Sequence, residues 1–434
     1  MDKEALKKRV CDTIDANRDK ICRIGRAIYD HPELGYKETF ASARVREVFE
    51  ELKLPYEDAL AVTGLKAKLK EHAQGPNIAI MGELDAVVCP DHPKADPATG
   101  AAHCCGHFAQ IAAMLGSAIG LCAVKDEIDS GNVTFLAVPA EECVEIEWRK
   151  EQIRAGKIKY LGGKQELLHL GVYDDIDMAM MVHGTGGHET VCCSAKSVGF
   201  IAKNVKFIGK EAHAGAAPWD GINALNAASL ALMAINSIRE TLKGPDCIRI
   251  HPIITKGGTL VNIVPNDVRM EMYVRGATID AIKDANAKVN RAIQGSAYAI
   301  GCEVEIVDLP GYLPVSDNVA LGRVFEENVH LLYPQMKTIH GTGIGGGSSD
   351  IGDVEATMPC IQAIVGGFRN AFHSKEFELA DEELAFIAPA KLMACTALDL
   401  LDDHAAKAEE ILKNFEGRYR PGDYDCIWED ITGK

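Results

Sequence analysis

The sequence lacks an apolar run long enough to cross a membrane, and it lacks an apolar core near its first residue. One apolar run, residues 108–124, falls short of the roughly 20 residues that a transmembrane helix needs, and Gln110 and Ser117 interrupt it. The first ten residues, MDKEALKKRV, are largely charged, unlike a signal peptide. We therefore expect a cytoplasmic protein without a membrane partner, and we expect most of its 14 cysteines to be reduced, buried and structural.

Positive charge is scarce relative to negative charge. The chain has 46 Lys and Arg residues against 63 Asp and Glu residues, which gives a formal net charge of −17 at pH 7. This balance argues against nucleic acid or an anionic membrane as the main partner. Tandem repeats and low-complexity segments are absent as well, so 434 residues with 47% hydrophobic content predict two ordinary domains with buried cores.

Apolar strands and helices alternate in the first part of the chain. Residues 77–81, 133–138 and 178–182 are typical of strands, and residues 108–124 are typical of a helix. Such alternation predicts an α/β domain whose mainly parallel sheet is covered by helices on both faces. Polar side chains follow these strands, where open α/β sheets bind ligands: Glu83 and Asp85, Glu141 and Glu142, and His183.

The pattern of the chain changes near Ser197. From there to residue 310 the predicted order is strand, helix, strand, strand, helix, strand, which fits a ferredoxin-like α+β layer. After Pro310 and Gly311 the pattern of long helices returns. We therefore predict a catalytic, metal-binding domain of residues 1–196 and 311–434, interrupted by an inserted domain of residues 197–310.

The segment HCCGH, residues 103–107, places a thiol and an imidazole one glycine apart. This spacing between Cys105 and His107 suits a loop folded around one ion. A thiolate and an imidazole bind Zn²⁺, Mn²⁺ or Co²⁺ better than Mg²⁺ or Ca²⁺. Two buried thiols and a core histidine would give the same cluster, so the segment by itself leaves both interpretations open.

Glu141 and Glu142 follow a predicted strand. Neighbouring side chains on an extended chain point in opposite directions, so the two carboxylates can have different roles. One could bind a metal while the other takes a proton from a water molecule that the metal activates. A solvated loop would explain the pair equally well. His183, His213 and His373 are similarly open, because each alone fits a core, capping or surface histidine.

Together these segments resemble peptidase family M20, and in particular its amidohydrolase branch. The matches run along nearly the whole chain, and their number, order and spacing make the resemblance specific. They are DHPELGY at 30–36, GELDA at 82–86, CGH at 105–107, PAEE at 139–142, HG at 183–184, GKEAHA at 209–214, GINAL at 221–225, VNIVPN at 261–266, SD at 349–350 and HS at 373–374.

The resemblance implies a role for each site residue. Glu141 would be the general base, Asp85 would orient a ligand imidazole, and His213 and Asn262 of the inserted domain would stabilise the oxyanion. That domain would act as a lid and form a homodimer, with His213 serving its own site or the partner's. One or two Mn²⁺ or Zn²⁺ ions would be held by Cys105, His107, Glu142, His183 and His373.

Two features depart from the family pattern. Phe108 stands where relatives carry an aspartate, and Gln110 stands where they carry a histidine, which puts a second metal in doubt. The segment 145–170 is longer and more basic than expected. It is either a solvated helix face or a lid that recruits an anionic group of the substrate.

The implied function is that of a metal-dependent amidohydrolase or peptidase. Such an enzyme would hydrolyse the amide bond of a small N-acyl or aminoacyl amino acid through a metal-activated water. Two alternatives stay open on the same scaffold. One is a hydrolytic deaminase that releases ammonia from an aromatic amine. The other is a non-catalytic binding protein, which the complete set of ligand and base positions disfavours.

Overall fold

The computed structural model describes residues 3–186, 190–341, 343–417 and 419–433. The chain divides into two compact units. Two short segments, 344–352 and 425–434, join the second unit, whereas the division from the sequence placed them in the catalytic domain. Unit 1 consists of Met1–Ala195, Ser316–Gly343 and Asp353–Tyr424, and unit 2 consists of Lys196–Val315, Ile344–Gly352 and Asp425–Lys434.

Unit 1 contains a sheet of eight strands in the order β1-β2-β6-β3-β7-β16-β8-β15. Its central strands are parallel, since β3 pairs in parallel with β6 and β7, and β7 pairs in parallel with β16. Antiparallel pairs occur toward the edges. The strands are β1 Tyr56–Leu60, β2 Gly64–Lys68, β3 Asn77–Glu83, β6 Asn132–Val138, β7 Met178–Gly184, β8 Thr190–Ser194, β15 Lys337–His340 and β16 Cys360–Val365.

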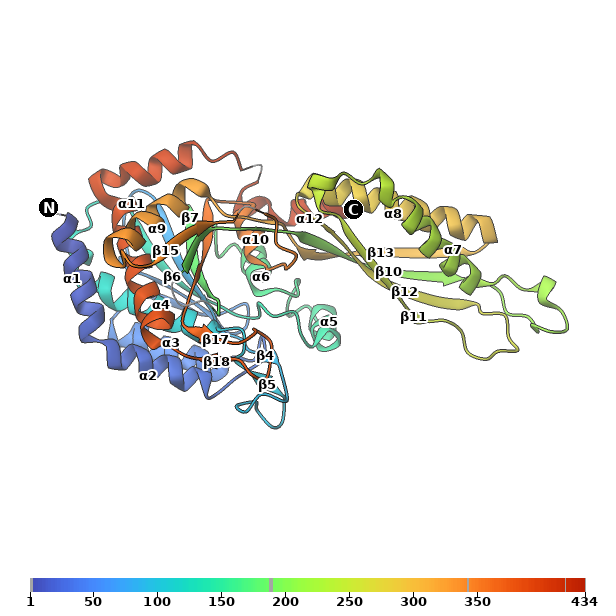
Figure 1. Ribbon diagram of the computed structural model, residues 1–434, viewed down its shortest axis with the longest axis horizontal. Helices are drawn as coiled ribbons and strands as arrows, with labels where there is room; N and C mark the ends of the chain where they lie inside the picture. The colour runs from blue at the N-terminus through green and yellow to red at the C-terminus, as the bar shows by residue number, and fades with distance from the viewer. Residues whose placement is uncertain (1–2, 187–189, 342, 418, 434) are drawn as a thin grey trace. The chain divides into compact units, whose positions relative to one another are not determined.

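Helices cover this sheet, as the alternation in the sequence predicts, and the α/β fold class is confirmed (Figure 1). Every residue of β3 and β6 is buried, which explains why both read as continuous apolar runs. The helices of unit 1 are α1 Lys3–Ala16, α2 Arg18–Tyr29, α3 Thr39–Glu51, α4 His107–Cys122, α5 Ile146–Arg154, α6 Gly163–His169, α9 Val319–Leu332 and α11 Ala388–Lys413, with α10 Ile351–Glu355 at the border between the units.

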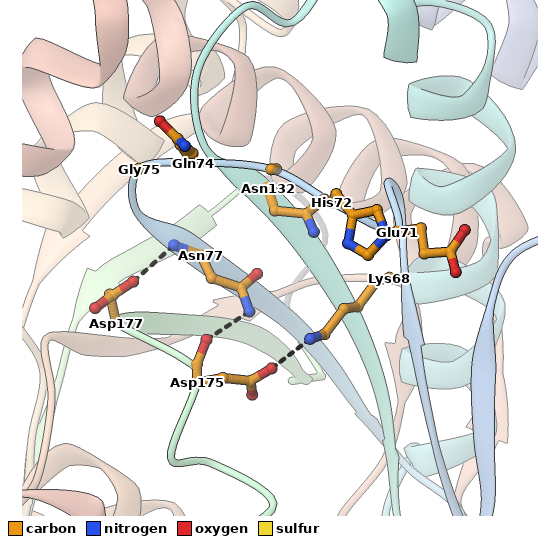
Figure 2. A pocket seen from close by; sticks show the side chains of 10 residues that line it. Lys68, Glu71, His72, Gln74, Gly75, Asn77, Asn132, Asp175 and Asp177 are labelled. Carbon is orange, nitrogen blue, oxygen red and sulfur yellow. Dashed lines mark hydrogen bonds and ion pairs between the residues drawn. The ribbon is translucent and has the colours of Figure 1, made fainter.

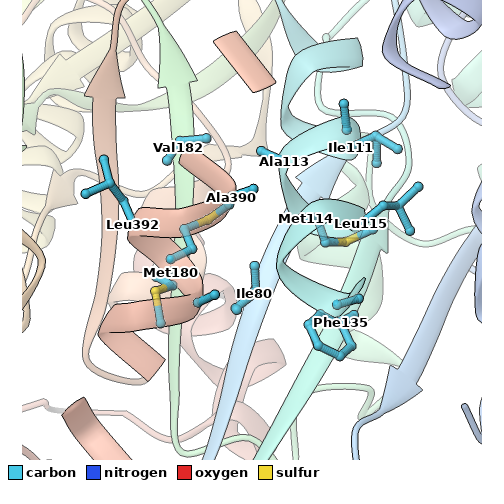
Figure 3. Packing of buried hydrophobic residues seen from close by; sticks show 14 of the residues in the cluster. Ile80, Ile111, Ala113, Met114, Leu115, Phe135, Met180, Val182, Ala390 and Leu392 are labelled. Atoms are coloured by element: carbon cyan, nitrogen blue, oxygen red, sulfur yellow. The ribbon is translucent and has the colours of Figure 1, made fainter. Parts of the chain in front are cut away.

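Helix α4 is the central helix of unit 1. Nearly all of its residues are buried, because it packs on β3, β6 and β7 on one side and on α11 on another. Figure 3 shows Met114 and Leu115 of α4 in one apolar cluster with Ile80, Phe135 and Leu392. Contrary to the expectation from the sequence, the helix Glu383–Lys413 is long and apolar enough to cross a membrane. In this structure 89% of its apolar window is buried inside the protein.

Unit 2 has the predicted strand-helix-strand-strand-helix-strand order. Its four strands form an antiparallel sheet in the order β11-β12-β10-β13, and α7 and α8 pack against it. Buried and exposed residues alternate along β12, as in a strand with one covered face. Its elements are β10 Gly199–Ile208, α7 Ala224–Ser237, β11 Arg249–Lys256, β12 Asp267–Gly276, α8 Ile279–Ile300 and β13 Glu303–Tyr312.

Short elements complete the two units. They are β4 Val87–Val88, β5 Ala101–Ala102, β9 Lys196–Ser197, β14 Val315–Ser316, β17 Phe368–Arg369, β18 Glu378–Leu379 and α12 Tyr424–Thr432.

A hollow of about 520 Å³ lies at the amino ends of β3 and β6 (Figure 2). Its polar groups bind one another: Asn77 N donates to Asp177 Oδ2 at 2.8 Å, and Lys68 Nζ lies 2.6 Å from Asp175 Oδ2. The predicted site residues follow the carboxyl ends of these strands, at the opposite edge of the sheet. The hollow is therefore separate from the site described below.

Candidate metal centre

Loops at the carboxyl ends of the parallel strands carry the predicted site residues. Asp85 follows β3, His183 lies near the end of β7, and Glu141 and Glu142 follow β6. His107 is the first residue of α4. Strand ends on one edge of the sheet thus bring together residues that are far apart in the sequence, as in other open α/β sheets.

Gly106 allows the tight turn between Cys105 and His107. Its φ is +84°, a left-handed conformation that side chains other than glycine rarely adopt. A Cβ at this position would also touch the ring of Phe368 at 3.4 Å. The glycine therefore lets the thiol and the imidazole point to the same place.

The first group of potential ligands consists of Cys105, His107 and His183. Their ligand atoms all lie within 4.8 Å of one another, and Cys105 Sγ is 3.5 Å from His183 Nε2. His107 Nδ1 lies 3.0 Å from the carbonyl oxygen of Asp85, and His183 Nδ1 lies 3.1 Å from that of Gly184. A carbonyl oxygen only accepts hydrogen bonds, so each Nδ1 carries the proton and each Nε2 is left to bind a metal.

The second group consists of Cys105, Glu142 and His373. His373 Nε2 is 3.0 Å from Glu142 Oε1, and the side chain of His373 is 49% exposed. Cys105 thus belongs to both groups. Because the two groups share the Cys105 thiolate, the arrangement fits two neighbouring ions as well as one.

Two buried atoms in these groups support a metal at this place. Among the described residues, His107 Nε2 and Glu142 Oε1 are buried without a partner in hydrogen-bond geometry. Buried polar atoms are rarely left unsatisfied, and those that are call for an explanation such as an ion. The mixture of thiol, imidazole and carboxylate suits Zn²⁺ or Mn²⁺. The residues present therefore fit the group that the sequence predicts.

The electrostatics of the groups also favour a cation. Burial lowers the pKa of His107, but the charges of Glu83 and Cys105 outweigh burial and raise that pKa well above its ordinary value. Burial raises the pKa of the Cys105 thiol, so a thiolate there needs a cation beside it. Burial raises the pKa of Glu142 as well, but His373 and His107 lower it overall. The centre attracts positive charge, whether a proton or a metal ion.

Asp85 holds two of the predicted ligands. It is completely buried, its Oδ1 lies 3.2 Å from His107 Nδ1, and its Oδ2 accepts a hydrogen bond from Glu142 N at 2.8 Å. Asp85 therefore orients the ring of His107 and the backbone of Glu142 together. Glu141 Oε2 lies 3.9 Å from His107 Nε2, and the Glu141 side chain is 12% exposed.

Glu83 lies beside the predicted ligands, although it is not among the ligands or catalytic residues predicted from the sequence. With His107 and Glu141 it forms a third group whose ligand atoms lie within 4.8 Å of one another. The available signal was its place beside Asp85 at the end of a buried strand. That signal did not separate Glu83 from an ordinary loop carboxylate.

Phe108 and Gln110 have separate roles. The Phe108 ring is fully buried, stacks on Tyr29 with centroids 4.5 Å apart, and meets Phe368 and Phe386 edge-on. The ring belongs to the core, and both ligand groups are complete without it. Gln110 Nε2 donates to Glu83 Oε2 at 2.8 Å, so this residue supports the site from α4.

The basic segment 145–170 contains both exposed and buried basic side chains. Arg154 and Lys157 are exposed, but Arg149 and Lys164 are completely buried. Arg149 donates to the carbonyl oxygens of Glu142 at 2.7 Å and of Leu161 at 2.6 Å. Two of the basic side chains therefore hold the strand ends in place rather than meeting solvent or a substrate.

His213 and Asn262 lie side by side in unit 2. Both are exposed, and Ala214 N donates to Asn262 O at 2.9 Å. His213 Nδ1 accepts hydrogen bonds from Gly215 N at 3.2 Å and Ala216 N at 3.0 Å, so its Nε2 carries the proton. His213 therefore presents an N–H donor to solvent. The roles given to His213 and Asn262 from the sequence remain predictions, as do those of the predicted ligands.

Comparisons with known proteins identify the family of the chain. The profile of the Peptidase family M20/M25/M40 matches residues 79–397. The chain is 29% identical over 420 residues to the Xaa-Arg dipeptidase of Mus musculus, which covers 92% of this chain and 89% of that protein. It is 25% identical to the N-acetylcysteine deacetylase of Bacillus subtilis (strain 168), covering 84% and 93%.

A solved structure has a similar fold. It is a dinuclear metal binding peptidase of the M20 family from Bacillus subtilis, with a TM-score of 0.71 and 22% identity, covering 89% of this chain and 99% of that one.

Proposed function

Because this chain belongs to the Peptidase family M20/M25/M40, we propose that it hydrolyses the amide bond of a small N-acyl or aminoacyl amino acid with the help of a bound transition metal. The observation that carries the proposal is the convergence of thiol, imidazole and carboxylate ligand atoms around Cys105. Its similarity to a dipeptidase and to a deacetylase supports a C–N bond as the point of attack.

The proposed metal ligands divide into two sets that share Cys105. His107 and His183 complete one set, and Glu142 and His373 complete the other. We assign Zn²⁺ or Mn²⁺, one or two per chain, because these ions accept sulfur and nitrogen ligands. When bound, such an ion polarises the amide carbonyl and makes water a better nucleophile at neutral pH.

Glu141 is the proposed general base. Its carboxylate lies at the edge of the ligand groups, 3.9 Å from His107 Nε2, and is mostly buried. It would take a proton from the attacking water and pass this proton to the leaving nitrogen. The proton is needed because a neutral amine is a far better leaving group than the deprotonated anion of that amine. Asp85 keeps the His107 ring in the tautomer that directs Nε2 into the centre.

His213 and Asn262 are the proposed oxyanion-stabilising residues of unit 2. The exposed Nε2–H of His213 is a donor suited to a developing negative oxygen. We further propose that unit 2 forms a homodimer. In its sheet β11 is an edge strand that pairs with β12, and Ile253 on β11 is 61% exposed. We also propose a cytoplasmic location, which the free state of all the cysteines supports.

A substrate screen on metal-loaded protein tests the proposal. The protein is stripped with a chelator, reloaded with Zn²⁺ or Mn²⁺, and offered dipeptides ending in Arg or Lys, N-acetyl amino acids, p-aminobenzoyl-glutamate and aromatic amines. Release of a free amino acid from an amide, absent in the Glu141→Gln control, supports the proposal. Release of ammonia from an aromatic amine without amide cleavage would replace it with the deaminase. Absence of every product from loaded protein would overturn it.

A further inference from the structure

We propose that Glu83 is an additional ligand of the metal ion on the His107 side of the centre. Lys164 and Gln110 hold its carboxylate in that position. The inference rests on the proposed function, because it concerns the same metal centre. The Glu83 side chain at the end of β3 is 1% exposed and lies outside the ligand set predicted from the sequence.

The carboxylate of Glu83 lies against the imidazole ring of His107. Glu83 Oε2 lies 3.0 Å from His107 Nε2, although Nε2 has no partner in hydrogen-bond geometry among the described residues. A protonated imidazole donating to the carboxylate would have that distance but would direct its N–H at the oxygen. Two ligand atoms that each lie about 2.1 Å from one zinc ion are roughly 3 to 3.5 Å apart. The contact therefore fits two ligands that point at one ion.

Gln110 and Lys164 bind the two oxygens of the Glu83 carboxylate. Gln110 Nε2 donates to Glu83 Oε2 at 2.8 Å, and Gln110 Oε1 accepts from Glu83 N at 3.1 Å. A carboxylate oxygen accepts more than one partner, so Oε2 keeps a lone pair for the ion. The other oxygen, Oε1, accepts from Lys164 Nζ. Both oxygens are thus fixed from outside the centre, as supporting groups fix metal ligands elsewhere.

The buried negative charge of Glu83 is balanced by the positive charge of Lys164. The side chains of Glu83 and Lys164 are 1% and 0% exposed, and their opposite charges stabilise each other in this buried place. Because Lys164 is fully buried, its charge acts on Glu83 inside the protein and does not meet solvent. The pair delivers an anionic oxygen to the centre and keeps the buried charge balanced when no ion is bound.

Helix α6 carries Lys164 in its first turn. Gly163 begins α6, and its N donates to Ala140 O at 3.0 Å. A Cβ at residue 163 would lie 1.7 Å from the carbonyl oxygen of Pro139, so only glycine allows this approach. The first turn of α6 therefore lies directly against the end of β6. This contact places Lys164 within reach of the neighbouring strand end at Glu83.

The test compares zinc affinity in four proteins. They are the wild type, Glu83→Gln, Lys164→Met and the double variant Glu83→Gln/Lys164→Met. Zinc affinity is measured by competition with a chelator of known affinity, and zinc content by mass spectrometry at buffered free Zn²⁺. The double variant is the decisive protein, because it removes the carboxylate together with the lysine charge that this carboxylate balances.

A loss of at least about tenfold in the affinity of one bound ion in the double variant supports the inference, by analogy with the effect of removing groups that support a metal site. Wild-type affinity in the double variant, with a loss only in Glu83→Gln, would overturn it, because Glu83 would then merely balance Lys164. If the wild type itself binds neither Zn²⁺ nor Mn²⁺, the proposed function fails with it. The two failures are therefore distinguishable.

A second variant keeps the test valid if the double variant does not fold. Glu83→Asp keeps the charge that Lys164 needs but withdraws the carboxylate oxygen by one methylene. A ligand role predicts weaker zinc binding in Glu83→Asp, and unchanged binding would overturn the inference.

Discussion

At the scale of single residues, both ligand groups depend on the sulfur of Cys105. Burial raises the pKa of this thiol, so metal binding must displace its proton. The Sγ of Cys105 lies 3.5 Å from His183 Nε2. Cys105 also belongs to the ligand group that contains Glu142 and His373. Its spacing from His107 in the sequence predicts one ion. Its position in the structure makes it common to two sets of ligands.

Glu141→Gln tests the division of roles between the two adjacent glutamates. Because Glu142 and not Glu141 is a proposed ligand, the variant is expected to keep its metal and its substrate affinity. Turnover should fall by on the order of 10²–10⁴-fold, the usual effect of losing a positioned proton-transfer group. Metal content and kcat are measured on the same preparation. Full activity in the variant would remove Glu141 from the mechanism.

Glu38 predicts a dependence of stability on pH. Burial and the charge of Asp85 raise the pKa of Glu38 to about 7, although it accepts hydrogen bonds from Thr63 Oγ1 and Ala140 N. An unfolded glutamate loses its proton near pH 4.3. Between about pH 4.5 and 7 the folded state therefore holds more protons than the unfolded state, and the stability contributed by this group falls as pH rises.

The variant Glu38→Gln removes this titration. We expect the wild type to lose on the order of 1–3 kcal/mol more stability than Glu38→Gln between pH 5 and pH 8. Urea unfolding of both proteins at the two pH values measures the difference. An equal change in the two proteins would show that Glu38 does not titrate in this range.

At the scale of elements, helix α5 supports the loop that carries Glu142. Arg149 is completely buried on this helix and donates to the carbonyl oxygens of Glu142 and Leu161. Arg154, one turn later on the same helix, is exposed. The two arginines differ in environment but not in chemistry, which makes them a matched pair.

We expect Arg149→Met to destabilise the protein and to weaken metal binding. Two carbonyl oxygens would lose their charged donor, and each buried group left without a partner costs about 1–3 kcal/mol. Arg154→Met should change stability by no more than about 0.5 kcal/mol. Thermal unfolding and zinc content of both variants provide the comparison. Similar behaviour of the two would refute the supporting role of Arg149.

At the scale of the whole molecule, His213 is predicted to serve either the site of its own chain or that of a partner chain. The mixing experiment uses His213→Ala and Glu141→Gln, each expected to be inactive alone. If His213 acts across a homodimer, random mixing restores both residues to about a quarter of the sites, and activity partly returns. If it acts within its own chain, no mixed site is intact.

Light scattering on the same samples establishes whether dimers form. A monomeric wild type with full activity would exclude the homodimer. Full activity of His213→Ala alone would contradict its role in either arrangement.

The sequence alone determined the class of the fold and the order of its elements. Continuous apolar runs such as 133–138 predict strands buried on both faces, and the change of pattern near Ser197 predicts the inserted unit. These features depend on local periodicity, which a single chain displays directly. The family resemblance also came from the sequence, because the matched segments keep their order and spacing along the chain.

The side chains that surround the ligands could be identified only from the packing of the folded chain. Glu83, Lys164 and Gln110 lie on a strand end and two different helices, and their contacts depend on how α4 and α6 pack on the sheet. The burial of Lys164 does not follow from its place in a run of basic residues. The packing of Phe108 in the core does not follow from its place in a motif. Long-range packing sets these contacts, and periodicity carries no information about it.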